Sequence, residues 1–395
     1  MSQTTYDLHI ETLSPVHIGS GRNLRGNFDY AMFTEERRLA VLDEKKVFDL
    51  IGRDQLQRWL AMIENGEDLL SYLRQRKPGL QPADIATRIV SIEGKIPDMQ
   101  SELREQIHLG APLRPTIPGS SLKGAVKTAV LATMIRKEPN FVQKEENLWI
   151  TGRRNKEVKD QQILAHYLNQ RENRNRRTGE LEPNPNEDAF RFLRLSDVHF
   201  DQTCTLQARM ANLLRDGWKW DDPRSPFVEC IPKGLHSRAR LQLPVDHVRL
   251  VRERNYMQKN LRYVSDPEYL FETINKHTTH LIQSELDFWQ EEELDYAVMN
   301  SYIEQLQDLQ EKVKACDSNA CILRLGYASG WESMTGRWAK DKDAFGDFIL
   351  GEYSWDTVRI ASRPKDERYD PSPFPKTRKT AGGAEPMGFA KISFL

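Results

Sequence analysis

The sequence predicts an α+β fold, in which strands and helices occupy separate runs of the chain around one core. Residues 6–18 alternate between apolar and polar side chains, which is typical of a strand with one buried face. Residues 268–313 are instead dominated by helix-forming sequence. The basic, glycine-containing tail ends in another strand-like run near Phe394. Strands at both ends with a long helical segment between them are typical of the α+β class.

Length and composition limit the possible functions. The chain has 395 residues, of which 38% are hydrophobic and 29% charged, so it can bury a real core although it is polar for its size. Its formal net charge is -1, so a nucleic-acid surface would have to be a local basic patch. The chain shows neither a leader sequence nor a bilayer-spanning run, which predicts a cytoplasmic protein with no membrane partner. Its four cysteines form no recognisable disulfide framework and are expected as buried thiols.

The stretch at 115–130 organises the rest of the chain. It is extended up to Pro118, breaks at Gly119 and restarts as a helix, for which Ser120 or Ser121 is the expected cap. Lys123 and Lys127 lie one turn apart beside a helix N-terminus, an arrangement that favours a phosphate. The order of residues excludes a Walker loop, because Lys123 precedes a glycine that is followed by alanine. The alternative is an ordinary capped surface helix.

The N-terminal elements follow in a clear order. The strand at 6–18 is expected to bend at Pro15 and to lead into a glycine loop at 19–26. Arg22 and Arg25 lie in this loop among flexible positions, so it is either a phosphate contact or a mobile hairpin tip. A hairpin at 27–32 and 38–42 and a helix at 44–60 follow.

Composition divides the chain into three regions. Residues 1–140 hold the N-terminal part of the core with a helical insertion at 61–110. Residues 141–188 form a charged arm, in which four arginines either contact RNA or are simply solvated (Arg171, Arg174, Arg176 and Arg177). Residues 189–395 return to the core with strands at 190–200, 227–231 and 239–243, the helical segment at 268–313, and a C-terminal glycine loop and strand.

The C-terminal third adds further basic positions. Arg337 stands between Trp331 and Trp338, a combination suited to base stacking beside a phosphate, although core tryptophans are the alternative. The tail carries Lys376, Arg378 and Lys379 ahead of two glycines. Four such loops scattered along the chain fit a polymer backbone better than one small ligand, which favours RNA. We assign no cofactor or metal, because the only conceivable zinc ligands match no standard spacing (His277, His280, Cys316 and Cys321).

These motifs carry a family resemblance. The strings Leu13-Ser-Pro-Val-His-Ile-Gly-Ser-Gly21, Val41-Leu-Asp-Glu-Lys45, Ile117-Pro-Gly-Ser-Ser-Leu-Lys-Gly124, Leu323-Arg-Leu-Gly326 with Ser329-Gly330, and Glu385-Pro-Met-Gly-Phe389 resemble the RAMP superfamily of CRISPR proteins. In that order they are similar to the family of fifth Csm subunits, from type III-A effector complexes. The sequence departs from the family at Tyr327-Ala328, where the family tends toward glycine.

The resemblance implies a ferredoxin-like, RRM-related core with helical and loop insertions. It also implies a non-catalytic subunit that binds the 3′ portion of a crRNA and caps the filament of backbone RAMP subunits. Further implied partners are the small helical subunit of the Csm complex, target RNA indirectly, and a host trimming nuclease. The residues expected to bind RNA are His17, Gly19, Gly21, Arg22, Arg25, Gly119, Ser120, Ser121, Lys123, Lys127, Arg337, Lys376, Arg378 and Lys379.

An enzyme is the rival hypothesis. A RAMP endoribonuclease that processes repeat RNA would need a general acid, and His17 is the only histidine inside a motif loop. Asp29 is the position nearest to the aspartate with which the neighbouring backbone subunit cleaves its target. It lies within Asn27-Phe-Asp-Tyr30 rather than in a free loop, so we expect no catalysis there.

Overall fold

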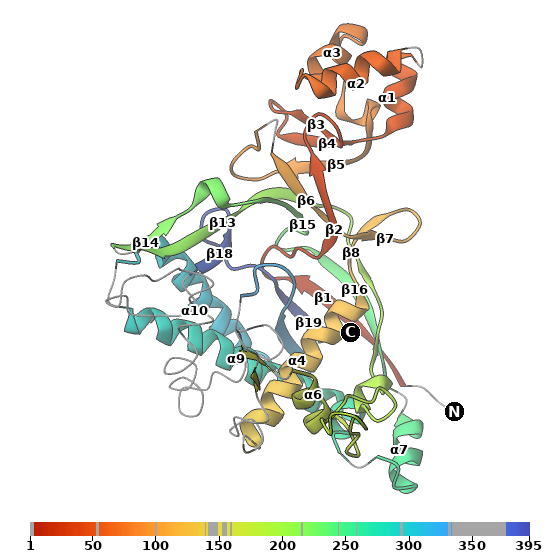
Figure 1. Ribbon diagram of the computed structural model, residues 1–395, viewed down its shortest axis with the longest axis vertical. Coiled ribbons are helices and arrows are strands. Elements are labelled where there is room, and N and C mark those ends of the chain that lie inside the picture. Colours follow the sequence, from red (N-terminus) through yellow and green to blue (C-terminus); the bar gives the residue numbers. More distant parts are fainter. Residues whose placement is uncertain are drawn as a thin grey trace.

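The computed structural model describes residues 4–395 except 53–54, 99–100, 139, 141–148, 152–155, 159, 215, 244, 258, 293–294, 331–332 and 334–376. Two large sheets organise these residues (Figure 1). One sheet, with its helices, forms the lower part of the molecule in that view. The other rises above it and carries a small helical group at its far end.

The first sheet has five strands in the order β11-β16-β1-β19-β17, and all neighbours in it are antiparallel. Its strands are β1 (Thr4–Thr12), β11 (Arg194–Leu195), β16 (His236–Leu243), β17 (Ala320–Arg324) and β19 (Phe389–Phe394). Leu8 and Ile10 of β1 are fully buried, as strand alternation requires. They join one apolar cluster with α4 (Gly119–Lys137) and α9 (Pro267–Glu291), so both helices cover this sheet.

The second sheet has nine strands, seven of them in the order β2-β6-β15-β13-β5-β4-β3. They are β2 (Gly19–Arg25), β3 (Tyr30–Phe33), β4 (Arg38–Leu42), β5 (Ala86–Ile92), β6 (Glu102–Gln106), β13 (Cys204–Leu214) and β15 (Phe227–Cys230). The long β13 also pairs with β14 (Gly217–Trp220) and β18 (Thr377–Ala381). Strands β2 and β3 stand at opposite ends of the strand order. Gly26, directly after β2, nevertheless forms a β-bridge with Tyr30 of β3, so the sheet must curl.

The remaining elements extend these two sheets. Helices α1 (Glu44–Ile51), α2 (Leu56–Glu64) and α3 (Leu69–Arg76) pack on β3, β4 and β5. Helix α10 (Asn300–Lys314) lies against α9, whereas α6 (Asp160–Leu168), α7 (Val245–Glu253) and α8 (Arg262–Ser265) lie at the opposite end of the molecule from α1–α3 (Figure 1). Strands β7 (His108–Leu109), β8 (Arg114–Ile117) and β12 (Val198–His199) form a small sheet, and β9 (Trp149–Thr151) pairs with β10 (Lys156–Val158).

The predicted α+β, ferredoxin-like RAMP core with insertions is confirmed. The strands expected at 227–231 and 239–243 are β15 and β16, and the helical segment at 268–313 is α9 with α10. The helix expected at 44–60 breaks into α1 and α2 at Gly52, which has a φ of 91° that a helix cannot continue.

Three local expectations were wrong. The glycine loop at 19–26 is mostly strand β2, which pairs with β6 across a bulge between Gly19 and Asn23. Residues 190–200 do not form one strand but a 3₁₀ turn at Ala189–Phe192 followed by the short β11 and β12. The insertion at 61–110 is helical only as far as Arg76 and then supplies β5, β6 and β7. In each case pairing with a distant strand overrides the local pattern.

Candidate nucleic-acid interface

The turn at 115–119 is closed by a carboxylate of the protein itself, that of Asp197. Helix α4 is capped by Pro118 without a side-chain bond, so the cap expected from Ser120 or Ser121 is wrong. The free N–H of Gly119 donates instead to Asp197 Oδ1, at 2.7 Å. A Cβ at position 119 would lie 2.1 Å from the carbonyl oxygen of Leu195, so only glycine allows β11 to come this close.

The two lysines of α4 differ in their surroundings. Lys127 forms an ion pair with Asp188 and lies 5.9 Å from the centre of the Phe190 ring. Lys123 is half-buried rather than solvent-facing, and among the described residues it makes no ion pair. Burial lowers the pKa of Lys123, and the charges of Lys127 and Arg194 lower it further against the opposing effect of Asp188. Lys123 is therefore the lysine that is available to an external anion.

Strand β2 carries the predicted arginines along the free edge of the nine-stranded sheet. Arg22 is mostly exposed and lies 3.9 Å from a carboxylate oxygen of Glu105. Arg25 donates through its backbone N–H to Asp29 and stacks on the ring of Phe28, with 4.1 Å between the guanidinium carbon and the ring centre. Asp29 thus closes the turn between β2 and β3. Gly21, with a φ of 89°, gives the edge its irregular path.

His17 lies inside the protein. Its side chain is 3% exposed, and Nδ1 is 2.5 Å from the carbonyl oxygen of Glu229. Burial lowers the pKa of His17, although the carbonyl and charge of Glu229 oppose this effect. On the other side of the ring, a Cβ at Gly19 would come within 3.3 Å of Nε2. The imidazole is thus held in a fixed position between β15 and the start of β2.

Tyr327 is the centre of a basic cluster that sequence reasoning missed. The guanidinium of Arg104, on β6, lies 5.0 Å from the centre of the Tyr327 ring, and Lys379 Nζ, on β18, lies 4.9 Å from it. The ring of His17 meets the same tyrosine edge-on, at 5.6 Å. Arg104 is exposed and Lys379 half-buried, so both cations can reach a ligand on the surface. We call Arg104, Tyr327 and Lys379 the tyrosine cluster.

The backbone around Tyr327 is tightly constrained. The N–H of Tyr327 donates to the carbonyl of His17, at 2.9 Å. Gly326 has a φ of 81°, and a Cβ there would lie 2.6 Å from that same carbonyl oxygen. Ala328 also adopts a left-handed φ, of 62°, which explains why glycine is favoured at a position where this chain has alanine.

A buried glutamine ties the separate motifs together. The side chain of Gln106 accepts from the N–H of Ile18 at 2.8 Å and donates to the carbonyl of Thr116 at 2.9 Å. Its backbone N–H donates to Glu229, which is fully buried and pairs with Arg88 at 3.0 Å. Gln106 thus holds the start of β2 beside β8, which leads into α4, while His17, in contact with Glu229 and Tyr327, adds the loop after β17.

Arg378 has a structural role despite its basic neighbours in sequence. It is 7% exposed, and its Nε donates to Glu285 Oε1 at 2.5 Å. Its guanidinium carbon lies 4.3 Å from the ring centre of Phe288 and near two tryptophan rings. An arginine enclosed in this way cannot contact RNA without breaking the core, so we remove it from the candidate interface. Arg337 and Lys376 lie outside the described residues, as do Trp331 and Trp338.

The conceivable zinc ligands do not assemble. His277 is buried against Arg136, and burial and the charge of Arg136 lower its pKa to about 3. Within the part of the chain that the structure describes, which includes all four conceivable ligands, no three His, Cys, Asp or Glu side chains gather as a metal site. In the same described residues no helix is long and apolar enough to cross a membrane.

The fold and the glycine-rich turns define a RAMP protein. The family model of the RAMP superfamily matches residues 9–291, and the chain belongs to this family, as its motifs predict. Among solved structures the fold is similar to the crystal structure of T. onnurineus Csm5, with a TM-score of 0.66 and 22% identity over 97% of this chain and 99% of that chain.

A second similar structure belongs to an assembly. It is a chain of the cryo-EM structure of a Csm–crRNA–target RNA ternary complex in a type III-A CRISPR-Cas system, with a TM-score of 0.68. Its sequence is 19% identical, and the similarity covers 99% of this chain and 100% of that chain. A search of curated protein sequences finds no significant match. Similarity at this level of identity concerns the fold, over the full length of both chains.

Proposed function

We propose that the protein is a non-catalytic crRNA-binding subunit of a type III-A CRISPR (Csm) interference complex. In this role it caps the filament of backbone RAMP subunits at the 3′ end of the crRNA and supports crRNA maturation and antiviral defence in the cytoplasm. Its neighbours would be a backbone RAMP subunit and the small helical subunit, with target RNA contacted indirectly. A host nuclease would trim the RNA. Membership in the RAMP family and full-length similarity in fold to Csm chains support this proposal.

The tyrosine cluster is the observation that carries RNA binding. Arg104 and Lys379 come from strands far apart in sequence, yet both approach the half-buried ring of Tyr327. A single RNA strand can make two kinds of contact with such a cluster. Its phosphates pair with the cations, and its bases stack on aromatic rings or guanidinium planes. Neither cation has an ion-pair partner among the described residues, so both remain available to phosphates. Lys123, on α4, and Arg22, on β2, are further cations that could bind phosphates.

The surroundings of His17 favour a binding protein over an endoribonuclease. A general acid must reach the leaving group, but the imidazole is buried and one nitrogen lies against the carbonyl of Glu229. Asp29 accepts hydrogen bonds from the backbone and side chain of Arg25 in the turn between β2 and β3. The rival reading, a RAMP endoribonuclease that processes CRISPR repeat RNA, would require His17 to leave its site.

Binding measurements test the role of the tyrosine cluster. Lys379→Ala and Arg104→Ala should each weaken binding of single-stranded RNA equally for a guide and a scrambled sequence, because phosphate contacts carry no sequence information. Each should reduce the slope of log affinity against log salt by about 0.7. Lys45→Ala, in α1, and Lys95→Ala, in the loop between β5 and β6, replace two exposed lysines and are the matched controls. Unchanged slopes in both cluster variants would remove the tyrosine cluster from the interface.

Two further experiments separate the candidate functions. The protein purified from its native cell should carry RNAs that share a repeat-derived part and have trimmed 3′ ends. Incubated alone with repeat RNA or target RNA, with or without a divalent metal, it should cleave neither. Cleavage that His17→Ala abolishes would replace our proposal with the endoribonuclease.

A further inference from the structure

The arm is an ordered hairpin rather than a loose loop. Within residues 169–187 the N–H of Asn175 donates to the carbonyl of Glu180 at 2.8 Å, and the N–H of Gly179 donates to the carbonyl of Asn175 at 2.9 Å. The side chain of Asn175 also accepts from the N–H groups of Arg177 and Thr178, which closes the tip. We call residues 169–187 the arginine hairpin. Its tip presents Arg176 and Arg177, both exposed.

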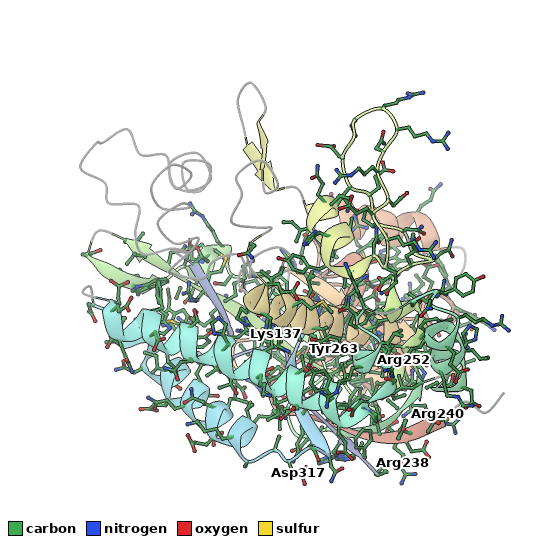
Figure 2. The ribbon with its side chains drawn as sticks, turned by 90° about the horizontal axis from the view of Figure 1, so that it is seen from below. Lys137, Arg238, Arg240, Arg252, Tyr263 and Asp317 are labelled. Atoms are coloured by element: carbon green, nitrogen blue, oxygen red, sulfur yellow. The ribbon has the colours of Figure 1, made fainter. Side chains whose placement is uncertain are left out.

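The base of the hairpin is docked on the segment that follows α7. Gln170 makes a reciprocal pair with the backbone of Lys259, donating to its carbonyl at 2.8 Å and accepting from its N–H at 2.6 Å. The side chain of Asn260 donates to the carbonyl of Tyr167 at 2.7 Å. Residues some ninety positions apart in sequence are thereby held together. Figure 1 shows α6, the hairpin and α7 at the end of the molecule opposite α1–α3, and Figure 2 views the molecule from below, with Arg252 of α7 labelled.

The charges on this end are unevenly neutralised. Glu172 pairs with Arg174, and Glu253 pairs with Arg249. The arginine hairpin also carries Glu180, Glu182 and Glu187, so the excess of positive charge at this end comes from the segment after α7. Four other cations are exposed and, among the described residues, form no ion pair: Arg176, Arg177, Arg254 and Lys259. The charge of Lys259 also reaches α6, where it adds to burial in lowering the pKa of His166. Exposed cations without counter-ions create a positive potential that attracts an anionic polymer.

An exposed aromatic ring lies within the same segment. Tyr256 is 61% exposed, although its neighbour Met257 is buried and anchors the loop. Asn255 has a φ of 55°, and the turn that it makes leaves Tyr256 exposed and Met257 buried. An exposed tyrosine between Arg254 and Lys259 in the sequence combines a ring on which a base can stack with cations that can bind the neighbouring phosphates.

We propose that the arginine hairpin and the segment after α7 form a second RNA-contacting surface, which binds the phosphates of a single strand through Arg176, Arg177, Arg254 and Lys259 and stacks a base on Tyr256. This inference rests on the proposed function and extends it from the tyrosine cluster to the opposite end of the five-stranded sheet. RNA is favoured over an acidic protein partner because the surface pairs an isolated exposed ring with separated cations. Because the hairpin is already ordered, binding here does not require an ordering step.

The test compares RNAs of two lengths on the full chain. Single-stranded RNA of about 40 nucleotides is long enough to reach both surfaces, whereas one of about 10 nucleotides occupies a single site of ordinary size. The double variant Arg254→Ala with Lys259→Ala should weaken binding of the long RNA and flatten its salt slope by about 1.4, twice the value for one contact. The backbone atoms of Lys259 that hold Gln170 remain in this variant.

A second pair of variants isolates stacking. Tyr256→Ala should weaken long-RNA binding on the order of tenfold, whereas Tyr256→Phe should retain it, because a phenyl ring stacks as well as a phenol. Lys45→Ala with Lys95→Ala, which removes two exposed charges elsewhere, should leave the salt slope of the long RNA at its wild-type value.

The outcomes are distinguishable. If wild-type protein binds neither RNA, the proposed function itself fails. If the cluster variants lose binding while the end-surface variants bind the long RNA with wild-type affinity and slope, only the second surface is refuted. Equal losses for Tyr256→Ala and Tyr256→Phe would likewise refute stacking. A loss confined to the long RNA supports the second surface.

Discussion

Replacing Arg378 by alanine should destabilise the fold without removing an RNA contact. Glu285 is buried, and Arg378 is its charged partner at 2.5 Å. Removing one partner of a buried ion pair costs up to about 3–5 kcal/mol when the other charge is left uncompensated. Trp289 still donates to Glu285 at 3.0 Å, and the charge of Arg324 still acts on it, so the loss should lie at or below the lower end of this range. The guanidinium also stacks on Phe288, at 4.3 Å, so the variant loses packing as well. This loss is a large part of the ~5–15 kcal/mol that stabilises a typical domain.

The pH dependence identifies the cause of that loss. Burial alone would raise the pKa of Glu285, but the charge and hydrogen bond of Arg378 hold it below its ordinary value. In the wild type the pair therefore stabilises the fold above the ordinary carboxyl pKa and loses this contribution as pH falls through the lowered pKa. Without Arg378 the largest effect that opposes burial is lost, and only the charge of Arg324 and the hydrogen bond from Trp289 still lower the pKa of Glu285, so its folded-state pKa rises. The penalty of the variant should then grow with pH above the ordinary value and shrink in mild acid.

Denaturant unfolding at several pH values measures this effect, with Lys379→Ala as the matched neighbour. Lys379 is half-buried beside Tyr327, so its loss should leave the free energy of unfolding within about 1 kcal/mol while RNA affinity falls. A double variant, Arg378→Met with Glu285→Gln, should recover much of the stability because it removes both charges. A stable Arg378→Ala protein with weakened RNA binding would refute the reasoning and restore Arg378 to the interface.

Three further outcomes follow from individual contacts. Gln106→Leu leaves the buried carbonyl of Thr116 and the half-buried N–H of Ile18 without this partner, and should lower the free energy of unfolding by at least about 1–3 kcal/mol, the cost of one buried unpaired group. Gly326→Ala should displace the loop that carries Tyr327, because its Cβ would meet the carbonyl of His17 at 2.6 Å, and RNA affinity should fall with stability. Lys123→Ala should reduce the slope of log RNA affinity against log salt by about 0.7, equally for a guide and a scrambled RNA. An unchanged slope would mean that Lys123 binds no phosphate and that α4 has only a structural role.

Local periodicity was sufficient for much of the fold. The alternation of Leu8 and Ile10 predicts β1, and the apolar spacing within 268–313 predicts the helices that cover its sheet. These signals can be read from the sequence because the residues on a buried face are apolar and recur at the period of the strand or helix, whichever element packs against that face. The motif strings also led to the RAMP family, which the family model confirms over residues 9–291.

The candidate interface depended on contacts between distant segments. The sequence offers Arg378 and Lys379 together as RNA contacts in a basic loop. Only the tertiary structure, in which both belong to β18, decides that Glu285 lies against one and Tyr327 beside the other. Arg104 carries no motif and becomes significant only because β6 brings it to the same ring. Charge and residue type are properties of the sequence. Whether a cation is buried against a carboxylate or left available to a phosphate is decided by pairing across the fold, because burial and counter-ions come from residues far away in the sequence, 93 positions in the case of Arg378 and Glu285.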